Sequence, residues 1–422
     1  MKIYGSAAEA AEILRRGGFD DGRADAVREI VRAVKERGDE ALFEYCEKFD
    51  GARPDADSVC VSEEETERAY AAVDAKLLGS LRKAIRNVYD YHARAPHEGD
   101  VRTENGRTTG YLIRPVERAG IYVPGGTAPL VSSVLMGVLP AKAAGVPHIY
   151  ACTPAKNGKV DPAVIVAAKE CGVEKLFKAG GAQAIAAFAY GTQSVPKVDV
   201  IAGPGNIYVT LAKKEVYGIA GIDMLAGPSE ILIIADGKQD PRYVAADVLS
   251  QAEHDKLARA LVLTDDAAFA KILQKEVERQ LALLPRREIA EYACEYSGGI
   301  ILVKDLEEAC ALANEIAPEH LELAIENCEE LLPKIRNAGA VFLGRYTPEP
   351  VGDYFAGPDH ILPTGGSARF FEVLNRDTFL RKMSVIRYSR EAISEDGEDI
   401  VRLAESEGLH AHANAVRVRL DK

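Results

Sequence analysis

From about residue 110 onwards, short β-rich runs that end in glycine alternate with alanine-rich stretches that favour helices. The first series contains "AGIYVPGG", "HIYACTP", "KLFKAGGAQAIAAFAYG" and "VDVIAGPGN", and the second contains "EILIIAD", "ARALVLTDD", "GGIILVKD" and "AGAVFLGR". This alternation is typical of βαβ units around a parallel sheet. We therefore predict an α/β fold with two Rossmann-like domains, each an incomplete version built on a parallel sheet.

The remaining parts of the chain favour helices. Residues 22–95 place apolar side chains at three- and four-residue intervals, as amphipathic helices do. The first residues, "MKIYGSAAEAAEILRR", predict a short amphipathic helix, and the segment after about residue 376 predicts a helical tail. We expect small helical segments at both ends of the α/β core.

Composition limits the possible partners. Of the 422 residues, 47% are hydrophobic and 28% are charged, which suits a soluble protein of two or three domains. The formal net charge of −13 argues against nucleic acid or an anionic membrane as a main partner. No apolar run reaches the roughly 18 residues that a membrane span needs, and the seven cysteines are scattered without a CxxC pair. Such cysteines indicate reduced thiols and a cytoplasmic protein.

Two glycine turns are candidates for nucleotide binding. "GPGNIY" at 203–208 begins as Gly-x-Gly-x-x but ends in Tyr208, where the dinucleotide fingerprint requires glycine. The turn lies between a strand-like and a helix-like run, where a phosphate would bind, and "KAGGAQAIAAF" repeats that arrangement. A dinucleotide held here would be bound in a non-standard way.

A first polar pair occurs in "SQAEHDKLARA". Gln251 and His254 are spaced i, i+3 and would share one face of a helix. Imidazole and an amide oxygen are both acceptable zinc ligands. A polar helix end is the more common explanation of such a pair, so this motif alone does not establish a metal site.

Two later segments are rich in polar residues. One is the glycine- and proline-rich stretch 351–366, and the other is the tail 405–416. Their members with metal-binding or acid–base chemistry are Asp353, Asp359, His360, His410 and His412. Each segment is either solvated or part of a site, because loops carry function out of proportion to their length. A tail this polar could also reach a neighbouring subunit.

The stretch "APEHLEL" at 317–323 places a glutamate beside a histidine. Pro318 suits the first turn of a helix, and apolar residues follow at helical spacing. Glu319 and His320 would then lie at the positive end of a helix, which keeps a carboxylate ionised and an imidazole neutral. A neutral imidazole can accept a proton, but glutamate in a first turn also stabilises ordinary helices.

Together, these segments resemble histidinol dehydrogenase over nearly the whole chain. The resemblance includes "KFDG" at 48–51, "GIYVPGGTAPLVSSVLM", "GGAQAIAA", "GPGNIYV", "DMLAGPSEILIIAD", "SQAEHD", "APEHLEL", "VGDYFAGPDHILPT" and "GLHAHANAV". It implies an NAD-dependent dehydrogenase that oxidises L-histidinol to L-histidine through L-histidinal, the last step of histidine biosynthesis.

The resemblance also implies one zinc ion per subunit. The implied ligands are Gln251, His254, Asp353 and His412. His410 and His360 fill no ligand position in this pattern. The zinc would chiefly hold histidinol by its imidazole and amino nitrogens, and manganese or cobalt could use the same ligands.

The same resemblance implies the catalytic roles. His320 would take the alcohol proton as hydride leaves for NAD, and Glu319 would activate water at the aldehyde stage. The implied substrate contacts are Ser229, Gln251, His254, Glu319, His320, Asp353, Glu407 and His412. The implied NAD contacts are Tyr122, Gln183 and Asn206.

The family pattern implies a homodimer with shared active sites, because its C-terminal segment crosses to the partner. It divides this chain into an N-terminal helical arm (1–16), a first α/β domain (17–121 and 231–375), a second, NAD-binding α/β domain (122–230) and the crossing segment (376–422). The first domain is expected to contain most of the zinc and catalytic site.

Two alternatives remain open. A relative could oxidise another small alcohol, such as a sulfonated diol, although Glu407 argues against it because a carboxylate repels a sulfonate. A catalytically silent metal- or nucleotide-binding protein would be expected to have lost Glu319, His320 or a zinc ligand, and none is lost.

Overall fold

The two series of β-rich runs form two separate parallel sheets. The structure is a computed structural model that describes residues 1–15, 22–94, 99–125 and 130–420. It divides into two units, Met1–Ala93 with Glu117–Phe379 and Arg94–Val116 with Leu380–Lys422. Both parallel sheets belong to the first unit, so the predicted α/β class is confirmed.

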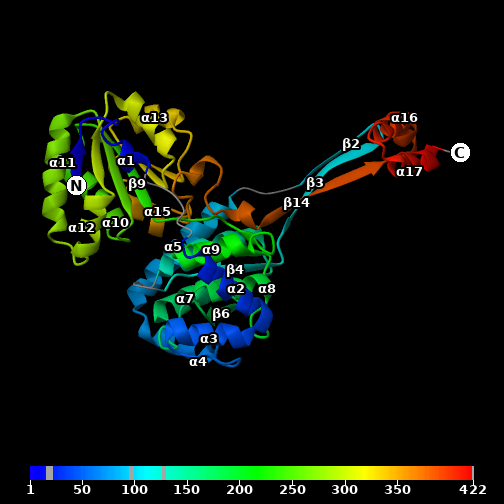
Figure 1. The fold of residues 1–422 in the computed structure, drawn as a ribbon, viewed down its shortest axis with the longest axis horizontal. Coiled ribbons are helices and arrows are strands. Elements are labelled where there is room, and N and C mark those ends of the chain that lie inside the picture. The colour runs from blue at the N-terminus through cyan, green and yellow to red at the C-terminus, as the bar shows by residue number, and fades with distance from the viewer. Residues whose placement is uncertain (16–21, 95–98, 126–129, 421–422) are drawn as a thin grey trace. The chain divides into compact units, whose positions relative to one another are not determined.

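The six-stranded sheet has the order β1-β11-β10-β9-β12-β13, and every adjacent pair is parallel. Its strands are β1 (Lys2–Tyr4), β9 (Glu230–Ala235), β10 (Arg259–Thr264), β11 (Gly299–Leu302), β12 (His320–Ala324) and β13 (Ala340–Leu343). One face is covered by helices α10 (Pro241–Ala252), α11 (Ala267–Leu281) and α12 (Arg287–Tyr296), and the other by α1 (Ala11–Arg15) and α13 (Leu306–Ile316) (Figure 1). Its central strands are nearly continuous apolar runs because both of their faces are buried.

The five-stranded sheet has the order β6-β5-β4-β7-β8 and is also parallel. Its strands are β4 (Arg118–Tyr122), β5 (His148–Thr153), β6 (Lys175–Lys178), β7 (Val200–Ala202) and β8 (Gly221–Ile222). The chain starts at the central strand β4, builds β5 and β6 to one side, and then crosses to β7 and β8. Sheets of this doubly wound order bind ligands where the strand order reverses, outside the carboxyl ends of β4 and β7.

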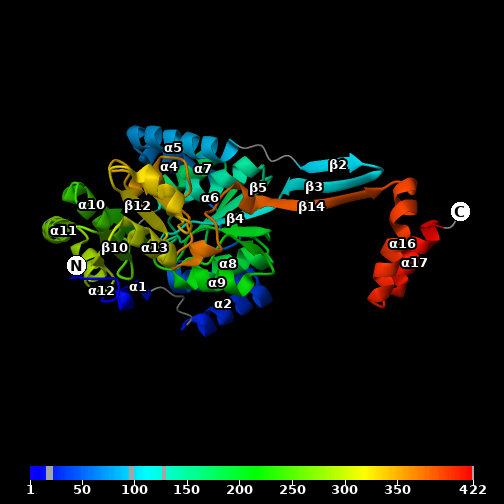
Figure 2. The same ribbon diagram turned by 90° about the horizontal axis from the view of Figure 1, so that it is seen from above.

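Helices cover both faces of the five-stranded sheet (Figure 2). One side has α4 (Glu63–Ala72), α5 (Ala75–Ala93), α6 (Val131–Ala144) and α7 (Pro162–Cys171), and the other has α2 (Ala24–Arg37), α3 (Asp39–Asp50), α8 (Gly181–Tyr190) and α9 (Ile207–Val216). Residues 24–93 form helices α2 to α5, interrupted by the non-helical stretch 51–62. They pack with this sheet, whereas the expected boundaries grouped them with the six-stranded one. The reason is that the apolar faces of α2 and α3 share a core with Phe177 and Phe188.

The start of the chain forms a strand and a short helix rather than the single amphipathic helix that we predicted. Strand β1 pairs with β11, with Ile3 opposite Ile300. Ala10 and Ile13 are buried in the core of the same sheet. These residues extend the edge of the six-stranded sheet, where backbone hydrogen bonds to β11 favour a strand over a helix. Residue 16, the end of the expected arm, lies outside the described residues.

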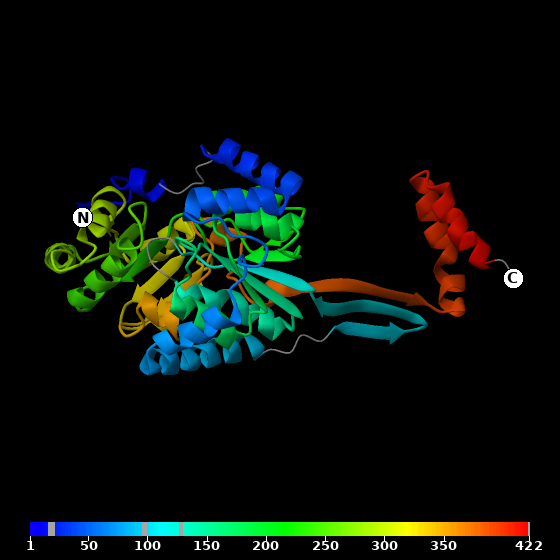
Figure 3. The same cartoon turned by 90° about the horizontal axis from the view of Figure 1, so that it is seen from below.

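The second unit is an antiparallel sheet followed by two helices. Strands β2 (Asp100–Glu104), β3 (Arg107–Pro115) and β14 (Leu380–Tyr388) lie side by side with β3 in the middle (Figure 3). Helices α16 (Arg390–Ser406) and α17 (His410–Leu420) pack against each other. The predicted helical tail therefore begins with a nine-residue strand, because pairing with β3 satisfies its backbone groups.

Short helical segments complete the described chain. They are α14 (Cys328–Leu331), α15 (Glu349–Tyr354) and the 3₁₀ turns η1 (Leu332–Lys334), η2 (Ser367–Arg369) and η3 (Arg376–Phe379). Within the described ranges, no helix combines the length and apolar character that crossing a membrane requires. The cysteines are all free thiols, in agreement with their scattered spacing.

Candidate active site

Glu319 and His320 lie at the start of strand β12 and not in the first turn of a helix. His320 is opposite Ile231 of β9 and Ala340 of β13, so the predicted helix over this stretch is wrong. Apolar residues at helical spacing also fit a strand that is buried on both faces. Hydrogen bonding to the two neighbouring strands favours the strand over the helix. The pair lies at the amino ends of β9 and β12, the opposite edge from the one that usually binds ligands in such sheets.

His320 is oriented by the backbone of Glu230. Its Nδ1 lies 3.1 Å from the Glu230 carbonyl oxygen, so Nδ1 carries a proton and donates it to this bond. Nε2 is then unprotonated; it is buried, has no hydrogen-bond partner in the described structure, and lies 3.8 Å from Oδ1 of Asp353. Burial lowers the pKa of His320 to about 3. The imidazole is neutral, as expected, but burial rather than a helix dipole is the cause.

The Glu319 carboxylate is buried and held by two donors. Its Oε2 accepts the backbone N–H of Glu230 at 2.8 Å, and the Ser229 hydroxyl donates to the same carboxylate. Burial raises the pKa of Glu319 well above its usual range, and these donors offset that shift only in part. We expected a helix start to keep this carboxylate ionised. Burial in the strand instead favours the protonated form of Glu319, and it makes the ionised carboxylate a stronger base.

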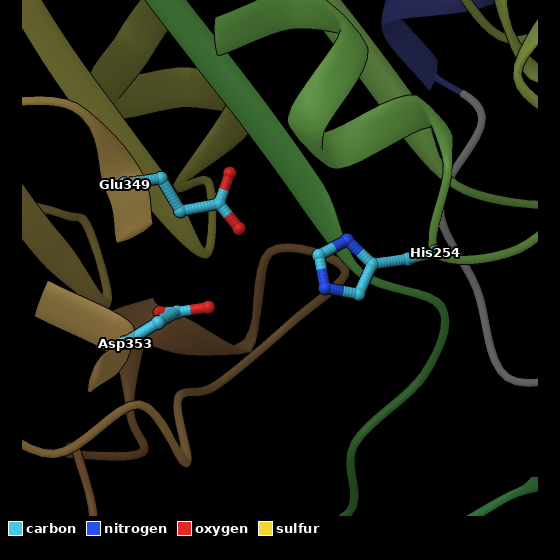
Figure 4. A group of neighbouring side chains, drawn as sticks. All are labelled: His254, Glu349 and Asp353. Atoms are coloured by element: carbon cyan, nitrogen blue, oxygen red, sulfur yellow. The ribbon is translucent and has the colours of Figure 1, made fainter. Parts of the chain in front are cut away.

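Three side chains beside His320 are close enough together to share one metal ion. The ligand atoms of His254, Glu349 and Asp353 all lie within 4.8 Å of one another (Figure 4). Glu349 and Asp353 are spaced i, i+4 on α15, so both carboxylates lie on the face directed at His254, which follows the end of α10.

Gln251 reaches the same place from the last turn of α10. Its side chain is 0% exposed, and its Nε2 lies 3.5 Å from Nδ1 of His254. Its Oε1 is buried and has no hydrogen-bond partner among the described residues. Buried polar atoms are normally paired, so this oxygen is available to a ligand. Oxygen and imidazole ligands of this kind suit zinc, and Gln251, His254 and Asp353 therefore fit the predicted ion.

Glu349 is a residue of this site that the sequence analysis missed. Its Oε1 lies 3.9 Å from Nδ1 of His320, its Oε2 is buried without a partner in the described structure, and burial raises its pKa well above its usual range. Its only signal was a position four residues before Asp353, in a stretch whose proline and glycine indicated a loop. His360, which fills no predicted ligand position, also lies here and hydrogen-bonds with the backbone of Asp353.

Two predicted site residues belong to the second unit. Glu407 is the C-cap residue of α16, and His412 lies in the first turn of α17; both side chains are exposed. The remaining predicted catalytic, substrate and metal residues are in the first unit, namely Ser229, Gln251, His254, Glu319, His320 and Asp353.

The predicted NAD contacts follow strands of the five-stranded sheet. Tyr122 is the last residue of β4, and its buried hydroxyl accepts the backbone N–H of Gly181 at 3.1 Å. Asn206 follows β7 and caps α9, because its Oδ1 accepts the N–H of Tyr208 at 3.0 Å. The turns after β4 and β7 adjoin the point where the strand order reverses.

Gln183, in the first turn of α8, has a buried side-chain amide. Neither its Oε1 nor its Nε2 has a partner among the described residues, and the side chain is 1% exposed. An unpaired buried amide is suited to binding a polar ligand. The hydroxyl of Tyr122 bonds the same turn at Gly181, so two predicted contacts lie together although the full glycine fingerprint is absent.

Comparison with known proteins identifies the family of this chain. The family described as histidinol dehydrogenase matches residues 15–420. The histidinol dehydrogenase of Carboxydothermus hydrogenoformans is 53% identical over 407 residues, which cover 96% of each chain. That of Heliobacterium mobile is 51% identical over 417 residues, which cover 98% of each. The crystal structure of histidinol dehydrogenase from Elizabethkingia anophelis matches with a TM-score of 0.94 at 39% identity and covers 100% of this chain and 98% of that one. The chain therefore belongs to the histidinol dehydrogenase family of oxidoreductases.

Proposed function

We propose that this chain catalyses the zinc-dependent, NAD-linked, four-electron oxidation of L-histidinol to L-histidine through L-histidinal, the last step of histidine biosynthesis. The observation that carries the proposal is the neutral, buried imidazole of His320. Its unprotonated Nε2 faces Asp353, beside a set of oxygen and nitrogen ligands that suit zinc. The names of relatives that are about half identical support histidinol as the substrate.

The proposed zinc ligands are Gln251, His254 and Asp353 of one subunit and His412 of the other subunit of a homodimer. When bound, zinc supplies a Lewis acid that also orients the substrate, and NAD supplies the hydride acceptor. The unpartnered Oε1 of Gln251 supports this assignment, because metal binding would satisfy it. Glu349 is a further carboxylate beside the same ligands.

His320 acts as the base in the first oxidation. Its Nε2 takes the hydroxyl proton of histidinol while the carbinol carbon gives up a hydride and becomes an aldehyde. The bond from Nδ1 to Glu230 keeps the accepting nitrogen directed at the substrate. Carboxyl oxygens of Glu319 and Glu349 lie 3.7 and 3.9 Å from Nδ1 of His320, and one of Asp353 lies 3.8 Å from Nε2. When these carboxyl groups are ionised, they stabilise the imidazolium that forms.

Glu319 acts at the aldehyde stage. Its carboxylate takes a proton from water, and the hydroxide adds to the aldehyde carbon. The hydrated aldehyde then gives a second hydride to a second NAD and becomes the carboxylic acid. The raised pKa of Glu319 suits this role, because a stronger base takes a proton from water more readily.

The second subunit completes the site in this proposal. Glu407 binds the cationic amino group of histidinol, and Ser229 contacts the substrate beside Glu319. The exposure of Glu407 and His412 on their own unit supports a role against another chain. The six-stranded sheet would then hold the zinc and catalytic residues, and the five-stranded sheet would bind NAD. The free cysteines support a cytoplasmic location.

The proposal is tested by incubating the purified protein with L-histidinol and excess NAD and following NADH. About two NADH are expected per histidinol, because two hydrides leave the substrate. The activity should disappear with a chelator and return with zinc. A protein that binds zinc but forms no NADH from histidinol would rule out this substrate and favour another small alcohol.

A further inference from the structure

Asp50 ends helix α3 where a carboxylate is unfavourable. It is the last residue of the helix, and the helix dipole places partial negative charge there. Gly51 follows with a φ of 82°, and the N–H of Asn157 donates to the Asp50 carbonyl oxygen at 2.8 Å. The "KFDG" motif therefore ends the helix and holds it against the loop after β5.

One carboxylate oxygen of Asp50 has no hydrogen-bond partner in the described part of the chain. The N–H of Gly180, the N-cap residue of α8, hydrogen-bonds with this carboxylate. Oδ2 is buried and accepts no hydrogen bond from the residues that the structure describes. Burial raises the pKa of Asp50 to about 6. The bond with Gly180 therefore does not account for the burial of Oδ2 without a described partner. A buried oxygen of this kind is normally paired.

Asp50 lines a cavity of about 110 Å³, together with Ala155, which follows β5, and Lys178 at the end of β6. A cavity of about 820 Å³ adjoins it, and Gly158 lines both. Thr153 is among the residues that line the larger cavity. The carboxyl ends of β5 and β6 therefore face enough space for part of a nucleotide.

The same place borders the proposed NAD contacts. The turn that bonds Asp50 through Gly180 also bonds the hydroxyl of Tyr122 through Gly181. Burial is the main cause of the raised pKa of Tyr122, and the charge of the nearby Asp50 adds to it. Gln183 lies in the first turn of α8, which this turn begins, so buried atoms of Asp50 and of Gln183 that lack a described partner both adjoin it.

The position in the sheet identifies the ligand. In doubly wound sheets, an acidic residue after the second strand binds the 2′-hydroxyl of the adenosine ribose of NAD. The second strand here is β5, and the first acid after it, Asp161, is exposed and caps α7 by accepting the N–H of Ala163. Asp50 reaches that place from α3 instead.

We propose that Asp50 binds the 2′-hydroxyl of the adenosine ribose of NAD and sets the preference for NAD over NADP. This proposal rests on the NAD-linked activity proposed above. A carboxylate accepts hydrogen bonds from ribose hydroxyls, and it repels the 2′-phosphate of NADP.

The test compares the wild type with Asp50→Asn, which keeps the size of the side chain and removes its charge. At saturating zinc and histidinol, the KM for NAD should rise about tenfold with little change in kcat. The kcat/KM for NADP, divided by the kcat/KM for NAD, should rise at least about tenfold. NAD binding measured by calorimetry without histidinol should weaken by a similar factor. The control is Glu40→Gln, an equal charge change at an exposed position of the same helix.

Several outcomes would overturn the assignment. An unchanged KM for NAD in a folded Asp50→Asn protein would remove Asp50 from the cofactor site. Weaker NAD binding with an unchanged NADP ratio would show that the carboxylate does not face the 2′-hydroxyl. A wild-type protein that forms no NADH from histidinol would be a failure of the proposed function instead.

A measurement on the unaltered protein does not depend on how well the variant folds. Binding of NAD is compared with binding of an NAD analogue that lacks the adenosine 2′-hydroxyl. We expect the analogue to bind about tenfold more weakly, because a hydrogen bond to a charged group is lost. Equal binding of the two compounds would contradict the proposal.

Discussion

Glu230 holds both Glu319 and His320 through its own peptide groups. Its carbonyl oxygen lies 3.1 Å from Nδ1 of His320, and its N–H donates to Oε2 of Glu319 at 2.8 Å. The Glu230 side chain is fixed in turn by a buried ion pair with Arg259 and by the N–H of Gly365 at 2.9 Å. One residue of β9 thus sets the tautomer of the proposed base and the position of the neighbouring carboxylate.

Replacing His320 by glutamine should remove the base without removing the metal site. We expect kcat for NADH formation from histidinol to fall by about two to four orders of magnitude, the usual contribution of a positioned base. Zinc content, measured by atomic absorption, should stay at the wild-type level. His148→Gln is the matched control, because His148 is partly exposed at the start of β5 and pairs with Glu174. Wild-type turnover in folded His320→Gln would exclude His320 as the base.

Replacing Glu319 by glutamine should separate the two oxidations. The alcohol stage keeps its base, whereas water at the aldehyde stage loses the group that takes its proton. NADH formed per histidinol should therefore fall from about two to about one, and added L-histidinal should not be oxidised. If the variant still forms two NADH per histidinol, water is activated by another group.

Replacing Gln251 by alanine should weaken zinc binding. The variant removes a buried oxygen that has no other described partner, and we expect the dissociation constant for zinc to rise at least about tenfold. Competition with a chromogenic chelator measures this constant without any turnover. Gln280→Ala is the control, because Gln280 lies on α11 and bonds Arg242 and Glu276. Equal zinc affinity in the two variants would exclude Gln251 as a ligand.

Two inactive variants should restore activity when mixed. In a homodimer with shared sites, His320→Gln and His412→Ala damage opposite halves of the same site. After joint refolding, half of the dimers are mixed and each contains one intact site, so activity should return to about a quarter of the wild-type value. Native mass spectrometry shows whether mixed dimers have formed. If they have formed but are inactive, each site is built from one chain.

Replacing Asp50 by asparagine should stabilise the protein at neutral pH. Burial raises the pKa of Asp50 from 3.8 to about 6. The folded protein then binds the proton more tightly than the unfolded chain, so the wild type loses stability as pH rises from about 4 to about 6 and stays at that lower level above it. The groups that face or influence this carboxylate are Cys46, Arg53, Tyr122, Lys178 and Gly180.

Thermal melting at two pH values measures this effect. The difference in Tm between Asp50→Asn and the wild type should be larger at pH 7.5 than at pH 4.5. Glu40→Gln serves again as the control. A variant that melts at the wild-type temperature at pH 7.5 would show that the buried carboxylate has no energetic cost.

Local periodicity was sufficient to predict the two parallel α/β layers. The runs around 230–235, 259–264 and 299–302 are strands in the structure, and most of 24–93 is helical. These predictions succeeded because a strand buried on both faces and an amphipathic helix each leave a pattern in consecutive residues. The resemblance of long motifs to one family supplied the expected catalytic and metal-binding residues.

The motif "APEHLEL" shows where a local pattern fails. Its apolar residues fit a helix and a buried strand alike, and the strand is chosen by β9 and β13, which are distant in the sequence. The pKa of Glu319 was expected to fall and instead rises, because burial outweighs the donors that hold it.

The order of amino acids was enough to predict the fold class, the family and the residue types available for chemistry. The folded structure was needed to show that Glu349 lies beside His254 and Asp353, and that Asp50 bonds the turn at Gly180. Pairing, burial and pKa depend on which residues meet after folding. Those contacts join segments far apart in the chain, so no pattern of consecutive residues records them.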